Sequence, residues 1–519
     1  MSACRRLPTR GAAPRLRLGL GLTALWLGVL ATASACGDDG SWQYNRNENA
    51  NLNRPTFPPC DPAATMQTLT FVHVNDLHAS YNPVDGESPV ARIRGFYQSL
   101  RAGNPYTLFT DAGDDHEKGS VAELLSEGWS TLEVTHALQF DVRVIGNHDF
   151  AWGADELLPF SRDPHGIVLA SNTEYTGSDP EGFGGVEWAE LQVGCLRLGF
   201  FGMVSKPWNE RNEQYDGDFL PEFHSRYDYV ELARDLVSTY RSQVDLVIMV
   251  SHLGLSWDET VAREVDGIQA ILGGHSHTTL STPAEVNDTI IIQTGAYAAN
   301  VARLDLDVDL GTGEIVDRRY ALVPNVQGDL TADATVEAAV ESTLQRWAPG
   351  YDQPVGVLAT QKTEHEVAEL TARAARQVHG VDAALVDVEE VWIGFFAGGV
   401  TPQDFADAFK VERQPADTTG FNSFYEVTLR GADLRALWDA MDRERWVLQM
   451  PSPVADGAIY TLALQKHAAF NPEVYLPAGV VVSSPTALAE AWATLNAYAK
   501  DRSLQCLHLD EDTPVTPCP

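Results

Sequence analysis

The chain has 519 residues, of which 44% are hydrophobic, and it carries 72 acidic against 36 basic side chains. This length exceeds that of a single-core domain, so we expect two domains, and the apolar content excludes a disordered chain. A formal net charge of −36 excludes a general affinity for nucleic acid polymers, because both partners would be polyanions.

The amino-terminal segment predicts export. Five arginines precede the apolar run LGLGLTALWLGVLATA, which is shorter than a spanning helix of roughly 20 residues. We therefore assign residues 1–35 to a signal peptide. Cys36, directly after Ala33-Ser34-Ala35, is typical of a bacterial lipoprotein, with the polar residues 36–65 as a tether from a membrane lipid anchor. Cleavage by ordinary signal peptidase and free secretion is the alternative.

The remaining cysteines would lie in a compartment that permits disulfides. Cys195 lies in the strand-like run VGCLRLGFFGMV, where we expect a buried free thiol. Cys506 and Cys518 flank a loop in the tail, residues 501–519, and their twelve-residue separation is easy to close. They are therefore the better disulfide pair.

Five short clusters of metal-type side chains each follow an apolar run. The runs are LTFVHV, YTLFTDA, VRVI, LVIMV and IQAIL. In chain order, the clusters contribute Asp76 and His78, Asp114, Asn147 and His148, His252, and His275 and His277. Apolar strands that end in such residues would place them along the carboxyl edge of one sheet, where α/β folds hold their sites.

Each cluster alone is weak evidence, since an Asp-x-His or Gly-Asp pair usually forms a turn or a helix cap. Five clusters in this order, each after its own strand, are typical of a metal centre. Carboxylates mixed with imidazoles suit two divalent ions such as Zn, Mn, Fe or Co. Because two ions that share one carboxylate can clamp a phosphoryl group, the pattern predicts a phosphoesterase site.

On the motifs VNDLH, GDDHEKG, GNHD, SH and GGHSH, the chain resembles the calcineurin-like metallophosphoesterases, and within them the 5′-nucleotidase family. The resemblance covers roughly residues 66 to 500 and weakens after residue 355. It implies a first metal held by Asp76, His78 and His277, a second held by Asn147, His252 and His275, and Asp114 as the bridge. It also implies that His148 binds no metal but stabilises or protonates at the phosphate.

The resemblance further implies the fold and the domain order. Residues 66–325 would form a four-layer αββα metallophosphoesterase domain, and residues 355–500 a smaller α/β domain like the carboxyl-terminal domain of 5′-nucleotidases. The alternation of strands and amphipathic helices supports the α/β class independently. We expect a linker helix within residues 326–354, over TADATVEAAVESTLQRW, and further helices near 364–379 and 432–442.

The catalytic motif departs from the family at one position. The family's Gly-Asn-His-Glu-Phe-Asp ends in an Asp that orients the catalytic His, and Ala151 stands there in this chain. Protein phosphatases of the same superfamily carry the orienting Asp three residues after the bridging Asp, where this chain has Glu117. We expect Glu117 to hold His148; the alternative is a solvated loop charge.

The second domain departs from the family where the nucleoside would bind. The family's Asn-x-Gly-Gly-x-Arg turn aligns with residues 387–392, so Trp392 replaces the arginine and three acids stand where an anion would bind. The family's two base-stacking aromatics align near Phe421 and at His467. We therefore assign substrate contacts to Phe421, His467 and Trp392, although packing in a core explains Trp392 and Phe421 equally well.

Together these features predict a dinuclear metal-dependent phosphoester hydrolase, similar to 5′-nucleotidases and 2′,3′-cyclic phosphodiesterases, acting on nucleotides or related phosphoesters outside the cytoplasm. Its partners would be a small phosphorylated substrate and a lipid anchor, and it would be a monomer on the periplasmic side or the cell surface. The alternative is a metal-bearing surface protein with weakened catalysis, whose altered second domain binds another ligand. We favour the enzyme because intact ligand clusters without metal would be unpaired buried charges.

Overall fold

The structure is a computed structural model of the chain, and it describes residues 55–117, 119–178, 182–207, 214–326, 328–409 and 422–516. The predicted signal peptide, Cys36 and most of the predicted tether lie outside the described residues, and so do Phe421 and Cys518. Within the ranges that the structure describes, no helix is long and apolar enough to span a membrane.

Two six-stranded sheets form the centre of the first domain, with the orders β14-β13-β1-β2-β3-β4 and β11-β12-β10-β9-β7-β6. The first sheet contains β1 (Met66–Val74), β2 (Thr107–Asp111), β3 (Val142–Val144), β4 (Ile167–Leu169), β13 (Asn300–Asp309) and β14 (Ile315–Pro324). The second contains β6 (Ala189–Val193), β7 (Leu196–Val204), β9 (Leu246–His252), β10 (Ala270–Gly273), β11 (Ala284–Val286) and β12 (Thr289–Ile292). The strands β1 to β4 are parallel, and so are β7, β9, β10 and β12, so the carboxyl ends of each set share one edge.

Alternating side chains explain why the two sheets stack. In β9, Leu246, Ile248 and Val250 join the apolar cluster between the sheets, whereas Val247 and Met249 join the cluster under the outer helices. All five side chains are buried. A parallel strand that is covered on both faces therefore appears in the sequence as a continuous apolar run.

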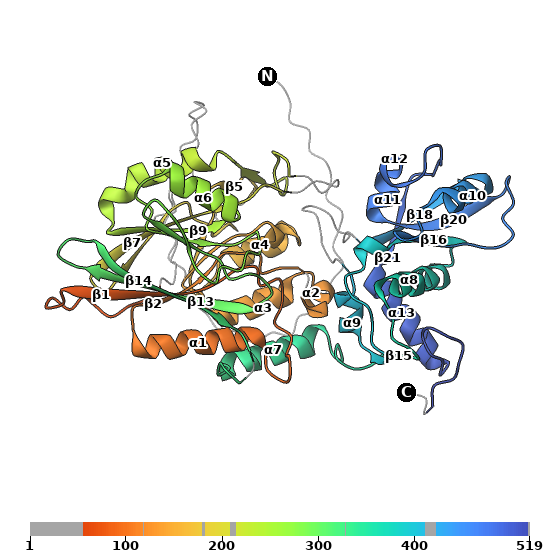
Figure 1. Cartoon of the computed structure of the whole chain (residues 1–519), viewed down its shortest axis with the longest axis horizontal. Helices are drawn as coiled ribbons and strands as arrows, with labels where there is room; N and C mark the ends of the chain where they lie inside the picture. The colour runs from red at the N-terminus through yellow and green to blue at the C-terminus, as the bar shows by residue number, and fades with distance from the viewer. Residues whose placement is uncertain are drawn as a thin grey trace, which may run out of the picture. The chain divides into compact units, whose positions relative to one another are not determined.

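Helices cover the outer face of each sheet (Figure 1). The outer layer of the first sheet contains α1 (Pro89–Gly103), α2 (Val121–Ser126), α3 (Trp129–Leu138) and α7 (Ala334–Trp347). The outer layer of the second contains α5 (Tyr229–Tyr240) and α6 (Leu255–Glu264). A helix, α4 (Ala154–Ser161), and a two-stranded ribbon, β5 (Thr173–Tyr175) with β8 (Phe223–Ser225), complete the domain. The predicted four-layer αββα architecture is confirmed.

The predicted linker helix is α7, and its start is set by a cap. Asp333 Oδ1 accepts hydrogen bonds from the backbone N–H groups of Thr335 and Val336, both at 2.9 Å. The helix packs against α1 and α3. It is therefore part of the first domain's outer layer.

A five-stranded mixed sheet with the order β19-β16-β20-β18-β21 forms the second domain, also as predicted. Its strands are β16 (Ala383–Asp387), β18 (Ser423–Arg430), β19 (Trp446–Gln449), β20 (Ile459–Gln465) and β21 (Thr486–Glu490), and β15 (Gly356–Leu358) pairs with β17 (Gly398–Val400). Its helices are α8 (Glu364–His379), α9 (Pro402–Asp407), α10 (Gly431–Ala440), α11 (Lys466–Phe470), α12 (Pro472–Tyr475) and α13 (Ala491–Leu504). Helix α8 matches the predicted range because Thr363 and Glu366 form a capping box at its start and Gly380, with a left-handed backbone, ends it.

The prediction of a free thiol at Cys195 is wrong. Cys195 forms a disulfide with Cys60, and a β-bridge joins the neighbouring residues Pro59 and Gly194. Gly194 and Cys195 form the turn between β6 and β7, so the thiol lies where the incoming chain can reach it. The end of the predicted tether is thus attached to the first domain. This disulfide indicates an oxidising compartment outside the cytoplasm.

A second disulfide involves Cys506. Cys518, its predicted partner, lies outside the described residues. The pairing of these two cysteines therefore stays a prediction.

Candidate metal centre

The metal-type side chains come from the carboxyl ends of strands in both sheets. Asp76 follows β1, Asp114 follows β2 and Asn147 follows β3, whereas His252 ends β9 and His275 follows β10. The prediction that they share the edge of one sheet is therefore wrong. Stacked sheets lie about 10 Å apart, so side chains from two aligned edges can meet across the gap.

Two triads of side chains could each hold a metal ion: Asp76, His78 and His277, and Asp114, His252 and His275. In the first triad, His277 Nε2 lies 3.0 Å from His78 Nε2 and 3.2 Å from Asp76 Oδ1. In the second, His252 Nε2 lies 3.0 Å from Asp114 Oδ2 and 3.2 Å from Asn147 Oδ1. Converging imidazole nitrogens and carboxylate or amide oxygens fit borderline divalent ions such as Zn, Mn, Fe or Co.

Asp114 lies between the two triads. Its Oδ2 is 3.0 Å from His252 Nε2 and 3.9 Å from His78 Nε2, so one oxygen approaches both groups. Burial alone would raise the pKa of Asp114, but His252 and His148 hold it well below its usual range, which keeps this carboxylate ionised. Burial lowers the pKa of His275 to about 3, so its ring is neutral, as a metal ligand must be.

Backbone carbonyls fix which nitrogen two of the histidines present. His78 Nδ1 donates to the carbonyl of His116 at 3.0 Å, and His252 Nδ1 donates to the carbonyl of Ala112 at 2.5 Å. A carbonyl can only accept, so Nδ1 carries the proton in both rings. Nε2 is therefore the coordinating atom, and this arrangement is usual for metal-bound histidines.

Five of the predicted ligand residues have a left-handed backbone. They are Asp76 (φ 53°), His78 (φ 48°), Asp114 (φ 58°), His275 (φ 72°) and His277 (φ 52°). This conformation costs roughly 1–2 kcal/mol per residue and persists where surrounding contacts impose it. Here the N–H of Asp76 donates to Gly113 and that of His78 to Asp114, both at 2.9 Å. Part of the stability of the fold thus offsets the strain of the backbone conformation that directs these side chains into the site.

Two glycines allow the loops after β2 and β3 to touch. A Cβ atom on Gly113 would lie 2.5 Å from the backbone nitrogen of Gly146, and Gly113 has a φ of +81°. A side chain is therefore excluded at this position for both reasons. These glycines precede Asp114 and Asn147, so the close approach brings those two side chains into one site.

Asp149 ties the same two loops together, and the sequence patterns did not single it out. Its carboxylate accepts hydrogen bonds from the backbone N–H groups of Asp114 (3.1 Å), Asp115 (3.0 Å) and Gly146 (2.7 Å). His116 Nδ1 also contacts it at 2.8 Å. The one sequence signal that could have indicated this role was an acid directly after His148; the structure shows that this acid is buried.

Two buried cations balance the acids beneath the loops. His116 lies between Asp149 and Glu156; burial works against its charged form, but these carboxylates raise its pKa well above the usual value. Arg143, fully buried in β3, contacts Asp115 and lies 3.4 Å from Asp163. In the sequence, an arginine inside the apolar run VRVI was a signal of such a network of buried charges. The contact of Arg143 with Asp115 holds the loop that contains Asp114.

His148 stands at the rim of the site with 18% of its side chain exposed. Its Nε2 lies 4.0 Å from Asp114 Oδ2, and its backbone N–H donates to Asp114 Oδ1 at 2.7 Å. The carboxylate of Glu117 contacts His148 Nδ1. Glu117 is 1% exposed, so it is a buried partner of the imidazole and not a solvated loop charge.

Glu123 in turn fixes Glu117. Its Oε1 accepts hydrogen bonds from the backbone N–H of Glu117 at 2.5 Å and from the indole of Trp152 at 2.7 Å, and its Oε2 accepts from Thr131 at 2.6 Å. The backbone of Glu117 is left-handed, with φ of 68°, and its hydrogen bond to Glu123 helps to impose this conformation. Trp152 directly follows Ala151, so the carboxylate of Glu123 joins the loop of Glu117 to the loop of His148. Nothing in the sequence alone indicated this link.

The predicted substrate residues lie in the second domain. Trp392 is 40% exposed, whereas His467 is 3% exposed and its Nε2 lies 3.3 Å from Asp387 Oδ2. Asp387 also accepts from Arg445 at 2.9 Å. Burial would raise the pKa of Asp387, but His467 and Arg445 keep it below its usual value. Two partners therefore offset the charge of this acid. The metal triads are assembled from the first domain alone.

Residues 69–279 match the calcineurin-like phosphoesterase family. The chain is 28% identical over 233 residues to a snake venom 5′-nucleotidase from Crotalus adamanteus, covering 42% of this chain and 39% of that relative. The match thus spans about two fifths of the relative's length. All seven predicted metal ligands lie within the family match, since it ends after His277.

Two solved structures share the fold over most of their length. A 5′-nucleotidase precursor from Thermus thermophilus superposes with a TM-score of 0.62 at 19% identity, covering 84% of this chain and 96% of that one. The sulfate thiohydrolase SoxB from the same organism superposes with a TM-score of 0.58 at 16% identity, covering 86% and 95%. At such identities the likeness shows the fold and not the substrate. Residues 69–279 thus match the model of the calcineurin-like phosphoesterases, and the chain shares the two-domain fold of these solved structures.

Proposed function

We propose that the chain is a dinuclear metal-dependent hydrolase of phosphoesters that acts on nucleotides or related compounds outside the cytoplasm. The observation that carries this proposal is the position of Asp114, whose Oδ2 approaches histidines of both triads. Two bound divalent ions would polarise the phosphoryl oxygens and activate a water molecule between them. Five of the seven ligand residues are buried, and His275 and His277 are partly exposed, so the site is largely preorganised, which supports a permanent centre.

His148 would act on the leaving group. Its ring stands beside Asp114, and the Glu117 carboxylate at Nδ1 fixes the ring and stabilises positive charge on it. Nε2 would then donate a proton to the leaving oxygen as the phosphorus–oxygen bond breaks and its electron pair departs with that oxygen. Glu117 would take the place of the carboxylate that Ala151 lacks, and Glu123 would hold Glu117 in position.

Substrate recognition would rest on the second domain and be weak for nucleosides. Trp392 offers an exposed ring for stacking, and His467, held by Asp387, would line the same region. Phe421 is assigned there from the sequence only, since it lies outside the described residues. We also propose a monomer on a lipid anchor at Cys36, on the periplasmic side or the cell surface. The Cys60–Cys195 disulfide supports an extracytoplasmic location.

A second candidate is a metal-bearing surface protein with weakened catalysis. It is favoured by the acidic segment 387–392, which lacks the arginine of the family's turn. In this case the metals would stabilise the first domain while the second domain binds a different ligand. The retained contact between Glu117 and His148 favours the enzyme, because a buried carboxylate beside an imidazole serves no evident packing need.

Assay of the purified chain with Mn or Zn separates the two candidates. The enzyme should hydrolyse p-nitrophenyl phosphate, bis-p-nitrophenyl phosphate or a member of a nucleotide panel, and His148→Ala should lower turnover by at least about 100-fold on a substrate whose leaving group needs a proton. His224→Ala is the matched control, since His224 pairs with Asp218 away from the triads and is half exposed. A metal-loaded chain that is silent on every substrate would support the binding protein instead.

A further inference from the structure

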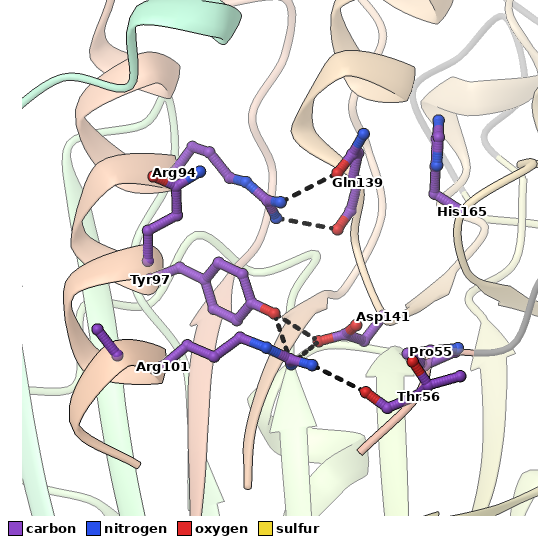
Figure 2. Close-up of a pocket in the computed structure, with 10 residues that line it drawn as sticks. Pro55, Thr56, Arg94, Tyr97, Arg101, Gln139, Asp141 and His165 are labelled. Carbon is purple, nitrogen blue, oxygen red and sulfur yellow. Dashed lines mark hydrogen bonds and ion pairs between the residues drawn. The ribbon is translucent and has the colours of Figure 1, made fainter. Parts of the chain in front are cut away.

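A pocket with two arginines in its wall lies beside α1, outside the metal centre. It has a volume of about 480 Å³, and its wall is made by Arg94, Tyr97, Gln98 and Arg101 of α1 and by the segment before and after Phe140. Figure 2 shows the two arginine side chains reaching from the helix on either side of Tyr97, toward Gln139 and Asp141. None of the predicted metal ligands lines this pocket. Any ligand it takes would therefore be bound independently of the metal centre.

Arg94 is held there by neutral groups only. Its two terminal nitrogens donate to the carbonyl and to Oε1 of Gln139, both at 3.1 Å, and its guanidinium lies 4.7 Å from the centre of the Tyr97 ring. Among the residues that the structure describes, no carboxylate forms an ion pair with it within 4 Å. Burial lowers the pKa of Arg94, while Tyr97 and the more distant charges of Asp141 and Asp333 act in the opposite direction.

Arg101 is also held mainly by neutral oxygens. It donates to the carbonyls of Thr107 at 2.8 Å and Thr56 at 3.0 Å. Asp141 lies 3.8 Å away, but its Oδ2 already accepts from the backbone N–H of Phe109 at 2.7 Å. Burial raises the pKa of Asp141 to about 6. Among the residues that line the pocket, one carboxylate faces two guanidinium groups, which leaves the lining positive in an otherwise acidic molecule.

We propose that this pocket binds an oxyanion, the carboxylate or phosphate group of a small molecule, between Arg94 and Arg101. Guanidinium groups present paired N–H donors that match two oxygens of such a group. Both are already fixed by carbonyl and ring contacts, so little side-chain freedom is lost on binding. The amides of Gln98 and Gln139 add uncharged donors at the rim. This site goes beyond the proposed phosphoesterase function and does not depend on it.

Calorimetric titration of the metal-loaded protein at constant ionic strength tests the proposal, with inorganic phosphate and citrate as separate probes. At least one probe should occupy a site that Arg94→Gln weakens by about tenfold or more. Phosphate alone would indicate a phosphate ligand, and citrate alone a carboxylate ligand. Arg234→Gln is the matched control: Arg234 also donates to a carbonyl, that of Glu264, but on the far helix α5.

Gln98 provides a second test that leaves the packing of Arg94 intact, since its side chain is exposed on α1. Gln98→Lys should tighten the same site and Gln98→Glu should weaken it, each by about threefold. Hydrolysis of p-nitrophenyl phosphate should be unchanged in both variants at low phosphate. Failure of both probes to bind outside the metal centre, or identical affinities in the Lys and Glu variants, would overturn the proposal.

Discussion

The metal centre and the segment 387–392 of the second domain differ in how firmly their polar side chains are held. Five ligand residues of the centre keep a left-handed backbone, and the buried carboxylate of Asp149 accepts hydrogen bonds from the loops of Asp114 and Gly146. In segment 387–392, Asp387 turns inward to Arg445 and His467, while Trp392 stays half exposed. The polar side chains of the first region converge on possible metal positions, whereas Asp387 in the second region is paired within a local ion cluster. Reaction chemistry and substrate choice can therefore diverge within one fold.

The largest expected effect comes from the charges beneath the centre. Arg143→Met should lower the free energy of unfolding by about 3–5 kcal/mol, because Asp115 and Asp163 would be left buried without their cation. Denaturant unfolding measures the change, with Arg234→Met, an exposed arginine of α5, as the control. A loss of less than about 1 kcal/mol in the free energy of unfolding would show that this network of charges does not stabilise the loops of the metal centre.

The next effect concerns the orientation of His148. Glu117→Gln should slow hydrolysis of phosphoesters with poor leaving groups by about 100-fold, about 2.7 kcal/mol, while p-nitrophenyl phosphate suffers less because its leaving group needs no proton. Metal content should stay at the wild-type value. Steady-state kinetics on phenyl and p-nitrophenyl phosphates measure the split.

Glu314→Gln, at an exposed turn between β13 and β14, serves as the control for Glu117. Equal losses on both substrates would contradict a leaving-group role for the pair of Glu117 and His148. A wild-type rate of Glu117→Gln on phenyl phosphate would show that Glu117 has no role in catalysis.

A smaller effect tests how the two sheets are joined near the centre. His73 Nε2 donates to the carbonyl of Gly273 and Nδ1 accepts from Thr110, each at 3.1 Å, so the ring links β1 to β10 in its neutral form. Burial lowers its pKa from 6.5 to about 4. The unfolded chain therefore binds this proton first as the pH falls, and stability present above pH 6.5 is lost on the way down to pH 4.

Between about pH 7.5 and pH 5, His73 should account for a loss of about 2 kcal/mol in the free energy of unfolding. His73→Gln should reduce the pH dependence by that amount, and denaturant titrations at the two pH values measure it. An unchanged slope in the variant would show that the histidine is not the linking group.

The smallest effect concerns nucleotide preference. Catalytic efficiency on adenosine monophosphate should exceed that on a generic aryl phosphate by at most about tenfold, or about 1.4 kcal/mol, because the proposed substrate residue at position 392 is a tryptophan, which has no cation to pair with a phosphate. Trp392→Ala should lower that ratio, whereas Trp257→Ala, an equally exposed tryptophan of α6, should not. A thousandfold native preference would show that the nucleoside pocket is built from other residues.

The layers of the fold and the strands that carry the ligands were predictable because helix and strand periodicity and the Asp, Asn and His clusters are local in sequence. Helix α8 was placed to the residue, since its capping box and terminal glycine are also local. The origin of the ligands from two different sheets was not predictable, because strand periodicity does not show which strands pair. Asp149, Glu123 and Arg143 act through contacts between distant segments, and the bond from Cys195 to Cys60 spans 135 positions. Such pairings depend on the folded arrangement.

Metal content per chain tests the central claim most directly. After reconstitution with excess Mn or Zn and removal of free ions, the wild-type chain should hold two ions. His78→Ala should lose mainly one, whereas Asp114→Asn should lower occupancy at both positions, because Asp114 Oδ2 approaches both triads. A wild-type chain with no more than one ion, or an Asp114→Asn variant that still holds two, would contradict a dinuclear centre bridged by Asp114.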